Sequence, residues 1–295
     1  MNNVLVSFFL RKHIYNLQSF VKSFKKKKKL LVGKRGVVTL LTKRQKCIIS
    51  VMLLSLGLLS SEYFFGKTAI LVSILLSICS DILLYWSIHD KEIKSIPRHI
   101  FILPFFYSLS FGLFYFLVPA RLLTRTITTT LYAIGLYSLF LSQNIFVVSA
   151  SRSIALLSSA RIVSFVITLL SYFFLANIVF SLHAFIVPTT LLIFVCSVFL
   201  ITHSLWSYTL QTSLYPWIFW TLALSLCLFE ISLILWFWPT NPTIIALFLT
   251  GFFYTTLGLV HAWLDKRLFR GVLWEYVWVA AIVFCVLVVS TSWGG

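Results

Sequence analysis

The sequence has few charged residues and very few acidic ones. Of its 295 residues, 11% are charged, and Asp and Glu together number seven. Water-soluble globular proteins carry about 25% charged residues. Because 60% of the residues are hydrophobic, the chain has too little polar surface to cover a globule in water. The composition excludes one or two soluble domains and predicts a protein embedded in lipid.

Paired cysteines and metal-binding spacings are also missing. The five cysteines occur singly, without a C-x-x-C pair: Cys47, Cys79, Cys196, Cys227 and Cys285. Neither a disulfide framework nor a zinc site is indicated. His261 and Asp265 are four residues apart, but an interfacial hydrogen-bonded pair is a better interpretation of them than half of a metal site. We expect no metal and no cofactor.

Catalytic motifs are absent as well. The sequence contains no Gly-rich phosphate loop, no G-x-S-x-G and no H-E-x-x-H. Serines are numerous, but serine commonly joins membrane helices to one another. No nucleophile can be assigned with its base, which disfavours an enzyme.

Basic residues are concentrated at the start of the chain. Residues 1–46 hold 13 Lys and Arg and no acidic residue. This block precedes a nearly neutral apolar body, which indicates anionic lipid headgroups as its partner. Nucleic acid is disfavoured because no aromatic reading surface or known nucleic-acid motif accompanies the block. The residues expected to contact lipid phosphate are Lys25, Lys26, Lys27, Lys28 and Lys29, together with Arg152.

Nine stretches are long and apolar enough, or nearly so, to cross a bilayer as helices of about 20 residues. We expect Pro104 to kink or shift the third span, and the sixth is short and contains Pro188. The sequence predicts an all-α fold, a polytopic transmembrane helix bundle of about nine spans with short loops. The nine stretches are Cys47–Phe65, Thr68–Ile88, Ile100–Val118, Ile127–Val148, Ile162–Phe180, Ala184–Ile201, Trp217–Trp238, Thr243–Trp263 and Val272–Val289.

Three regions follow from this pattern. Residues 1–46 form a basic cytoplasmic segment, 47–290 the transmembrane domain and 291–295 a short tail. Apolar residues in the first region recur at roughly helical spacing. That region is therefore either an interfacial amphipathic helix or a basic tail without fixed structure.

The distribution of basic residues predicts the orientation. With a cytoplasmic N-terminus, the inner segments carry 21 Lys and Arg and the outer turns carry three. Cytoplasmic loops of membrane proteins are enriched in these residues. We expect a multi-pass protein of the cell membrane with its N-terminus in the cytoplasm and its C-terminus outside.

Two carboxylates lie at membrane depth, where a charge costs at least about 2.5–3.5 kcal/mol. Asp81 is seven residues from the inner end of the second span, and Glu230 is eight residues from the outer end of the seventh. Each is either a proton- or cation-binding group on a transport path or a structural carboxyl that is neutral or paired. Arg161 is an available partner for Asp81, whereas the sequence places no cation at the depth of Glu230.

The stretch from Ser142 to Val163 interrupts the apolar pattern. The amides of Gln143 and Asn144, just inside the fourth span, need partners on other helices. If the connection that follows is one helix, Arg152 and Arg161 point to opposite faces, because nine residues separate them. We predict an inner polar cluster of Asn144, Gln143 and Arg161 with Asp81. A serine-rich turn with two arginines near the headgroups is the alternative.

The run QNIFVVSASRSIALLSSARIVSFVITLL, residues 143–170, resembles an uncharacterised family of multi-spanning bacterial membrane proteins. The resemblance covers the middle third of the chain and rests on the Gln-Asn-Ile-Phe start and the two arginines. It implies a bacterial inner membrane and several spans. No activity is assigned to that family, so the resemblance implies no catalytic residue.

Three functions remain open. The first is a small-molecule or ion transporter or permease that uses Glu230 and Asp81 as ion sites and the inner cluster as a gate. The second is an enzyme acting on a lipid or lipid-linked phosphate at the cytoplasmic face, with Arg152 and Arg161 on the phosphate and Asp81 as base. The third is a non-catalytic subunit of a membrane complex. The intramembrane carboxylates favour the transporter.

Overall fold

The structure, a computed structural model, describes residues 42–65, 68–89, 96–119, 121–149, 156–210 and 217–291. In these ranges all regular structure is helical. Eight helices are long and apolar enough to cross a membrane, counting η1 with α4. The predicted all-α bundle of about nine spans is confirmed. Its helices are α2 (Lys43–Phe65), α3 (Ala69–Ile88), η1 (Arg98–Phe101), α4 (Ile102–Leu117), α5 (Leu122–Ser149), α6 (Leu157–Ser181), α7 (Ile186–Thr209), α8 (Ile218–Trp236), α9 (Pro242–Leu264) and α10 (Arg270–Val289).

The predicted lipid-phosphate residues lie outside the described part of the chain: Lys25, Lys26, Lys27, Lys28, Lys29 and Arg152. The predicted interfacial helix lies outside it too. The first described helix, α2, begins at Lys43 and so includes the end of the predicted basic segment. There the ammonium group of Lys46 lies 5.4 Å from the centre of the Trp86 ring, a cation–π contact between α2 and α3.

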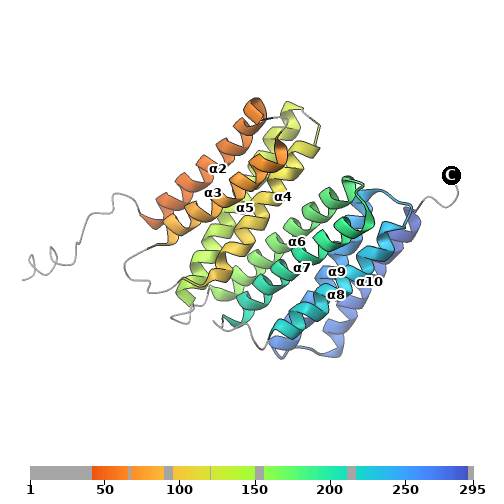
Figure 1. Ribbon diagram of the computed structural model, residues 1–295. Helices are drawn as coiled ribbons and strands as arrows, with labels where there is room; N and C mark the ends of the chain where they lie inside the picture. The colour runs from red at the N-terminus through yellow and green to blue at the C-terminus, as the bar shows by residue number, and fades with distance from the viewer. Residues whose placement is uncertain are drawn as a thin grey trace, which may run out of the picture. The chain divides into compact units, whose positions relative to one another are not determined.

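Consecutive helices run antiparallel, and α6 lies at the centre of the bundle (Figure 1). It packs against α4, α5, α7 and α9, whereas α10 packs chiefly against α9. We call the end of the bundle at which α6 begins and α7 ends the inner end, because the sequence predicts that it faces the cytoplasm. The opposite end is the outer end.

Both prolines that were expected to disturb helices lie in a first helical turn. Pro104 is the third residue of α4, and Pro188 is the third residue of α7. At Pro188 this costs little, because the first N–H groups of a helix have no partner within the helix. Pro104 follows the change from η1 to α4, where the N–H of Ile102 donates to the carbonyl oxygen of His99. The predicted sixth span was too short: it ended at Ile201, but α7 continues to Thr209. The last turns of α7 carry buried polar residues, which lower the hydropathy without ending the helix.

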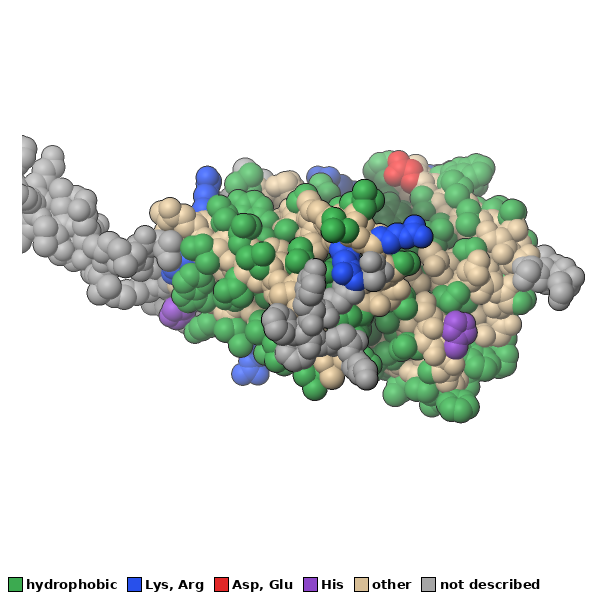
Figure 2. Space-filling view, turned by 90° about the horizontal axis from the view of Figure 1, so that it is seen from above, with side chains coloured by type: hydrophobic (Ala, Val, Ile, Leu, Met, Phe, Trp, Pro, Cys, Tyr) green, Lys and Arg blue, Asp and Glu red, His purple; other side chains and the backbone are tan. Residues whose placement is uncertain are grey.

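The outer surface of the bundle is apolar. Large hydrophobic side chains are exposed along the helices, among them Leu71 on α3, Phe219 on α8 and Trp278 on α10. Figure 2 shows one face, on which hydrophobic side chains are widespread and charged ones are few and separated. A bilayer covers such a surface, whereas water does not. The described bundle is therefore that of a multi-pass membrane protein.

Candidate functional site

Buried polar side chains lie along α6 and α7, two helices that pack against each other. We call this set the polar seam. On α6 they lie at positions 164, 168, 171 and 172, which share one face of the helix. The seam consists of Ser164, Thr168, Ser171 and Tyr172 on α6, and of Thr189, Thr190, Ser197, His203, Ser204 and Ser207 on α7.

Side chains bridge the two helices at two depths within the seam. Near the middle, the hydroxyl groups of Tyr172 and Ser197 lie 3.2 Å apart. Closer to the inner end, the hydroxyl of Ser164 lies 3.3 Å from Nε2 of His203. Many other hydroxyls of the seam donate to a carbonyl of their own helix, as Thr168 does to Ser164 at 2.8 Å. The seam is thus polar along its length but is crossed by few bonds.

His203 is the centre of the seam's largest polar network. Its Nδ1 lies 2.8 Å from the carbonyl oxygen of His99 in η1, so Nδ1–H donates and Nε2 is an acceptor. The Ser164 hydroxyl donates to Nε2, and the amide nitrogen of Gln143 on α5 lies 3.4 Å from it. His203 and Gln143 are fully buried. The other amide atom of Gln143, Oε1, is buried and has no hydrogen-bond partner in the described part of the chain.

A second histidine continues the network toward the inner end. His261 on α9 is buried, and its Nε2 lies 3.1 Å from the hydroxyl of Ser204. The ring of Tyr208 stacks on His261 with 3.7 Å between the ring centres. The guanidinium of Arg161 lies 5.0 Å from the centre of the Tyr208 ring on the same column. Arginine, tyrosine and histidine therefore close the inner end of the seam.

The sequence indicated Arg161 as a partner for Asp81, but the structure does not bring the two side chains together. The guanidinium donates to the carbonyl oxygens of Ser207 at 3.3 Å and of Tyr208 at 2.6 Å, in the last turn of α7. A cation is stabilised there by the unpaired carbonyls and the negative end of the helix dipole. Asp81 lies on α3, and α4 packs against both α3 and α6.

Among the described residues, no hydrogen bond joins the remaining members of the predicted inner cluster to Arg161. Asp81 is half-buried, and its Oδ1 atom is buried without a partner among the described residues. Asn144 is also half-buried, and its Oδ1 has no partner in the same part of the chain. Of these remaining members, Gln143 joins the seam network through His203.

Glu230 lies on the exposed surface of α8. Its helix packs against α7 and α9, with Ser225, Leu228, Ser232 and Leu235 on the buried side. The side chain therefore does not point into the polar seam. A role of Glu230 and Asp81 in ion binding stays a prediction.

Sequence reasoning missed both buried histidines, because it placed them near span ends. The signal was present in the spacing: His203, Ser204, Ser207 and Tyr208 recur like one face of a helix. Arg161, inside α6 instead of at its start, continues the stripe of Ser164 and Thr168.

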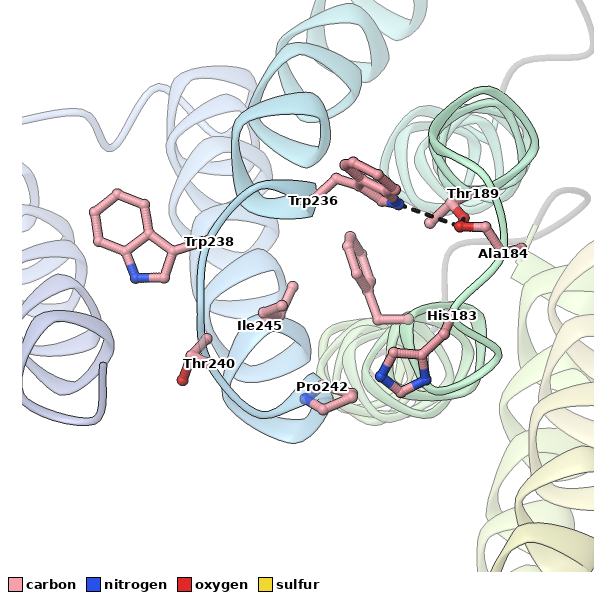
Figure 3. A pocket seen from close by; sticks show the side chains of 9 residues that line it. His183, Ala184, Thr189, Trp236, Trp238, Thr240, Pro242 and Ile245 are labelled. Carbon is pink, nitrogen blue, oxygen red and sulfur yellow. Dashed lines mark hydrogen bonds between the residues drawn. The ribbon is translucent and has the colours of Figure 1, made fainter. Parts of the chain in front are cut away.

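A depression of about 220 Å³ lies at the outer end of the bundle. Helices α6 and α8 end there, and α7 and α9 begin there (Figure 3). Thr189 belongs both to the depression and to the seam, so the seam reaches the outer surface at this point. The depression is lined by Phe180, His183, Ala184, Thr189, Trp236, Trp238, Thr240, Pro242 and Ile245.

Within the described residues, no group of three or more His, Cys, Asp and Glu side chains is placed to hold a metal ion. The five cysteines are free thiols. The polar side chains of the seam are hydroxyls and an imidazole, and the guanidinium of Arg161 lies at its inner end.

Comparison with known protein families assigns the chain. Residues 48–290 match the family described as "Protein of unknown function (DUF5656)". The chain belongs to this family. Within the described ranges, the match covers α3 to α10 and all of α2 except its first five residues. Comparisons with curated proteins and with solved structures give no match. The expectation of an uncharacterised family is confirmed, and the family brings no activity with it.

Proposed function

We propose that this protein transports a small polar solute or an ion across the cell membrane along the polar seam between α6 and α7. The observation that carries the proposal is the continuity of the seam. It runs from Thr189 in the outer depression to the Arg161–Tyr208–His261 column at the inner end.

The energetic cost of buried polar groups explains why a continuous line of them indicates a function. Polar groups in a membrane domain are unfavourable unless they find partners, and their usual role is to join neighbouring helices. Joining alone does not require His203 and Gln143 in one buried network, in which Oε1 of Gln143 has no partner among the described residues. Buried ionisable groups in membrane helices commonly mark solute or proton paths.

The seam is closed in this structure. Tyr172, Ser197 and His203 are all fully buried. Transport therefore requires α6 and α7 to separate, at the cost of the Tyr172–Ser197 and Ser164–His203 bonds. Hydrogen bonds between membrane helices contribute about 0.6 kcal/mol each on average. A solute that forms hydrogen bonds with the freed side chains can therefore offset the free energy lost when the two bonds break.

In this proposal the N-terminus is cytoplasmic and the outer depression faces the outside. Asp81 on α3, whose buried Oδ1 has no partner among the described residues, stays a candidate proton or cation site. Glu230 stays a candidate on the exposed surface of α8. A proteoliposome flux assay of Glu230→Gln and Asp81→Asn tests both, because loss of flux with intact folding is expected only of a coupling carboxylate.

The path itself can be tested before the solute is known. In a chain whose five native cysteines are replaced by alanine, Ser164→Cys and Ser197→Cys are reconstituted separately into liposomes. A membrane-impermeant cationic methanethiosulfonate is then added. We expect both to react, because the seam must admit water when it opens. Leu84→Cys, equally buried on α3, is the matched control and is expected to stay unreactive.

The transport proposal is wrong if both seam cysteines react no faster than Leu84→Cys from either side. Size-exclusion profiles and thermal unfolding of each variant establish that it is folded. A reaction of Ser164→Cys from one side and Ser197→Cys from the other would support a path with a closed point between them.

One observation favours a second function, that of a subunit in a membrane complex. Helix α10 is almost entirely exposed, and Trp274, Trp278 and Ile282 form part of its apolar surface. A partner helix is one candidate to cover this surface, and lipid is the other. Cross-linking from Trp278→Cys in native membranes separates the two. The lipid-enzyme hypothesis has less support, since the guanidinium of Arg161 is already engaged with carbonyl oxygens of α7.

A further inference from the structure

The outer depression is lined by polar groups whose donors are already used. Nδ1 of His183 donates to the carbonyl oxygen of Ser181 at 2.9 Å. The indole N–H of Trp236 donates to the carbonyl oxygen of Ala184 at 3.2 Å, the bond drawn in Figure 3. No side-chain N–H of these two residues is left for a ligand.

The hydroxyl groups of the two threonines of the depression also already donate hydrogen bonds. The Thr189 hydroxyl donates to the carbonyl oxygen of Phe185 at 2.9 Å, and that of Thr240 donates to Ser290 at 3.2 Å. The indole N–H of Trp238 donates to the hydroxyl of Thr291 at 2.7 Å, and its ring points away from the depression (Figure 3). Each threonine oxygen retains lone pairs, so these side chains can only accept hydrogen bonds from a ligand.

His183 supplies the best-placed acceptor. With Nδ1–H engaged, Nε2 of the neutral ring is an acceptor. The backbone of His183 is held in the left-handed region, with φ of 46°, which few residues other than glycine adopt. Strained backbone of this kind persists where the surroundings impose it, often at binding sites. In Figure 3 the imidazole lies at the edge of the depression opposite Trp236.

The electrostatic field of the helix dipoles does not favour a ligand of either charge at the depression. The positive ends of α7 and α9 and the negative ends of α6 and α8 meet at the depression and oppose each other. The side chains therefore decide the selectivity. They offer acceptors from His183, Thr189 and Thr240, together with the aromatic rings of Trp236 and Phe180. Aromatic faces attract cations.

We propose that the outer depression binds a small alkylammonium group. The ammonium N–H donors pair with Nε2 of His183 and the threonine oxygens, and the charge lies against the rings. The group can belong to a free amine or to the ethanolamine headgroup of a phospholipid, because the depression lies where headgroups are expected. The inference rests on the proposed transport function only in its claim about what happens to the ligand after it binds. Binding itself can be measured without transport.

The test uses full-length protein labelled with 5-fluorotryptophan in phosphatidylglycerol nanodiscs, a lipid without an ammonium group. Loss of one ¹⁹F signal in Trp236→Phe assigns Trp236. Titration with ethanolamine chloride is expected to shift this signal saturably, and sodium acetate is expected to leave it unmoved. A shift already present in phosphatidylethanolamine nanodiscs without added amine would identify the lipid headgroup as the ligand.

Variants of His183 probe the acceptor. His183→Phe keeps an aromatic ring but removes Nε2, and is expected to weaken ethanolamine binding by about tenfold, the loss of one hydrogen bond to a charged donor. His183→Asn restores an acceptor and tolerates the left-handed backbone, so it should bind more tightly than His183→Phe. His89→Phe, at an exposed histidine of the inner end, is the matched control and should bind like the unaltered protein.

Three outcomes overturn this proposal: no shift of Trp236 with either source of ammonium, a saturable shift with acetate instead, or unchanged binding in His183→Phe. The transport proposal is tested independently of the ammonium site. Ethanolamine binding with unreactive seam cysteines would refute transport but support the ammonium site. Reactive seam cysteines without ammonium binding would support transport but refute the ammonium site.

Discussion

Helices α6 and α10 are almost equally apolar by hydropathy, yet they occupy opposite environments. Most of α6 is buried among four neighbours, whereas α10 is exposed along nearly its whole length. The difference lies in the polar residues. Helix α6 carries a stripe of serine and threonine, and α10 contains neither within Arg270–Val289. In lipid, apolar surface needs no burial, so it is the polar stripe that draws a helix into the bundle.

The largest test of this comparison puts a bulky residue at matched positions. Ser171 on α6 is fully buried and Ala281 on α10 is exposed. Ser171→Phe overfills a packed contact and should lower the free energy of unfolding by about 1–3 kcal/mol or more. Ala281→Phe should change it by no more than about 0.5 kcal/mol. Thermal unfolding in nanodiscs measures both. Equal losses in the two variants would show that α10 is packed in the membrane after all.

A smaller effect is expected at the contact that holds α10. A Cβ atom at Gly251 on α9 would lie 2.8 Å from both γ-carbons of Val283, whose branched side chain cannot move aside. Gly251→Leu should therefore push α10 away, with a loss of about 1–2 kcal/mol. A disulfide between Phe248→Cys and Phe284→Cys, in a chain without native cysteines, reports the separation.

The matched control for Gly251 is Gly57 on α2. A Cβ there would meet the end of the Leu76 side chain at an ordinary 3.5 Å. Gly57→Leu should leave the cross-link between positions 248 and 284 intact. A cross-link that forms equally well in Gly251→Leu would show that α10 does not depend on this close approach.

The smallest effect is expected from a single hydroxyl in the seam. Tyr172→Phe removes the bond to Ser197, which keeps its own bond to the carbonyl of Ile193 at 2.7 Å. The expected loss is about 0.6 kcal/mol. Tyr276→Phe on α10, where the structure gives the hydroxyl no hydrogen bond among the described residues, should cost nothing measurable. A double-mutant cycle with Ser197→Ala isolates the coupling between Tyr172 and Ser197.

The fold could be predicted from the sequence to a large extent, because the bilayer restricts the chain to apolar helices of known length. The errors fell where polar residues end a hydropathy run without ending a helix. His203 and Ser204 shortened the predicted sixth span, although they belong to α7 and face its neighbours. Hydropathy averages over all sides of a helix and so cannot distinguish a buried polar face from a helix end.

The site could be predicted much less well. The depth of a residue follows from counting along its span, and this depth indicated Arg161 as a partner for Asp81. Which side of the helix it occupies depends on the neighbours, and α4 packs between their helices. The outer depression was not predicted because its residues come from the ends of four helices and share no motif.

Two buried polar groups beside His203 have no hydrogen-bond partner among the described residues, and this has a consequence for how the α6–α7 contact would open. They are Oε1 of Gln143 on α5 and the indole N–H of Trp206 on α7, whose ring centre lies 5.9 Å from that of His203. A water molecule that reaches either group gains a hydrogen bond at once. Hydration of the closed interior should therefore begin at these two groups before it spreads along the two helices that must part.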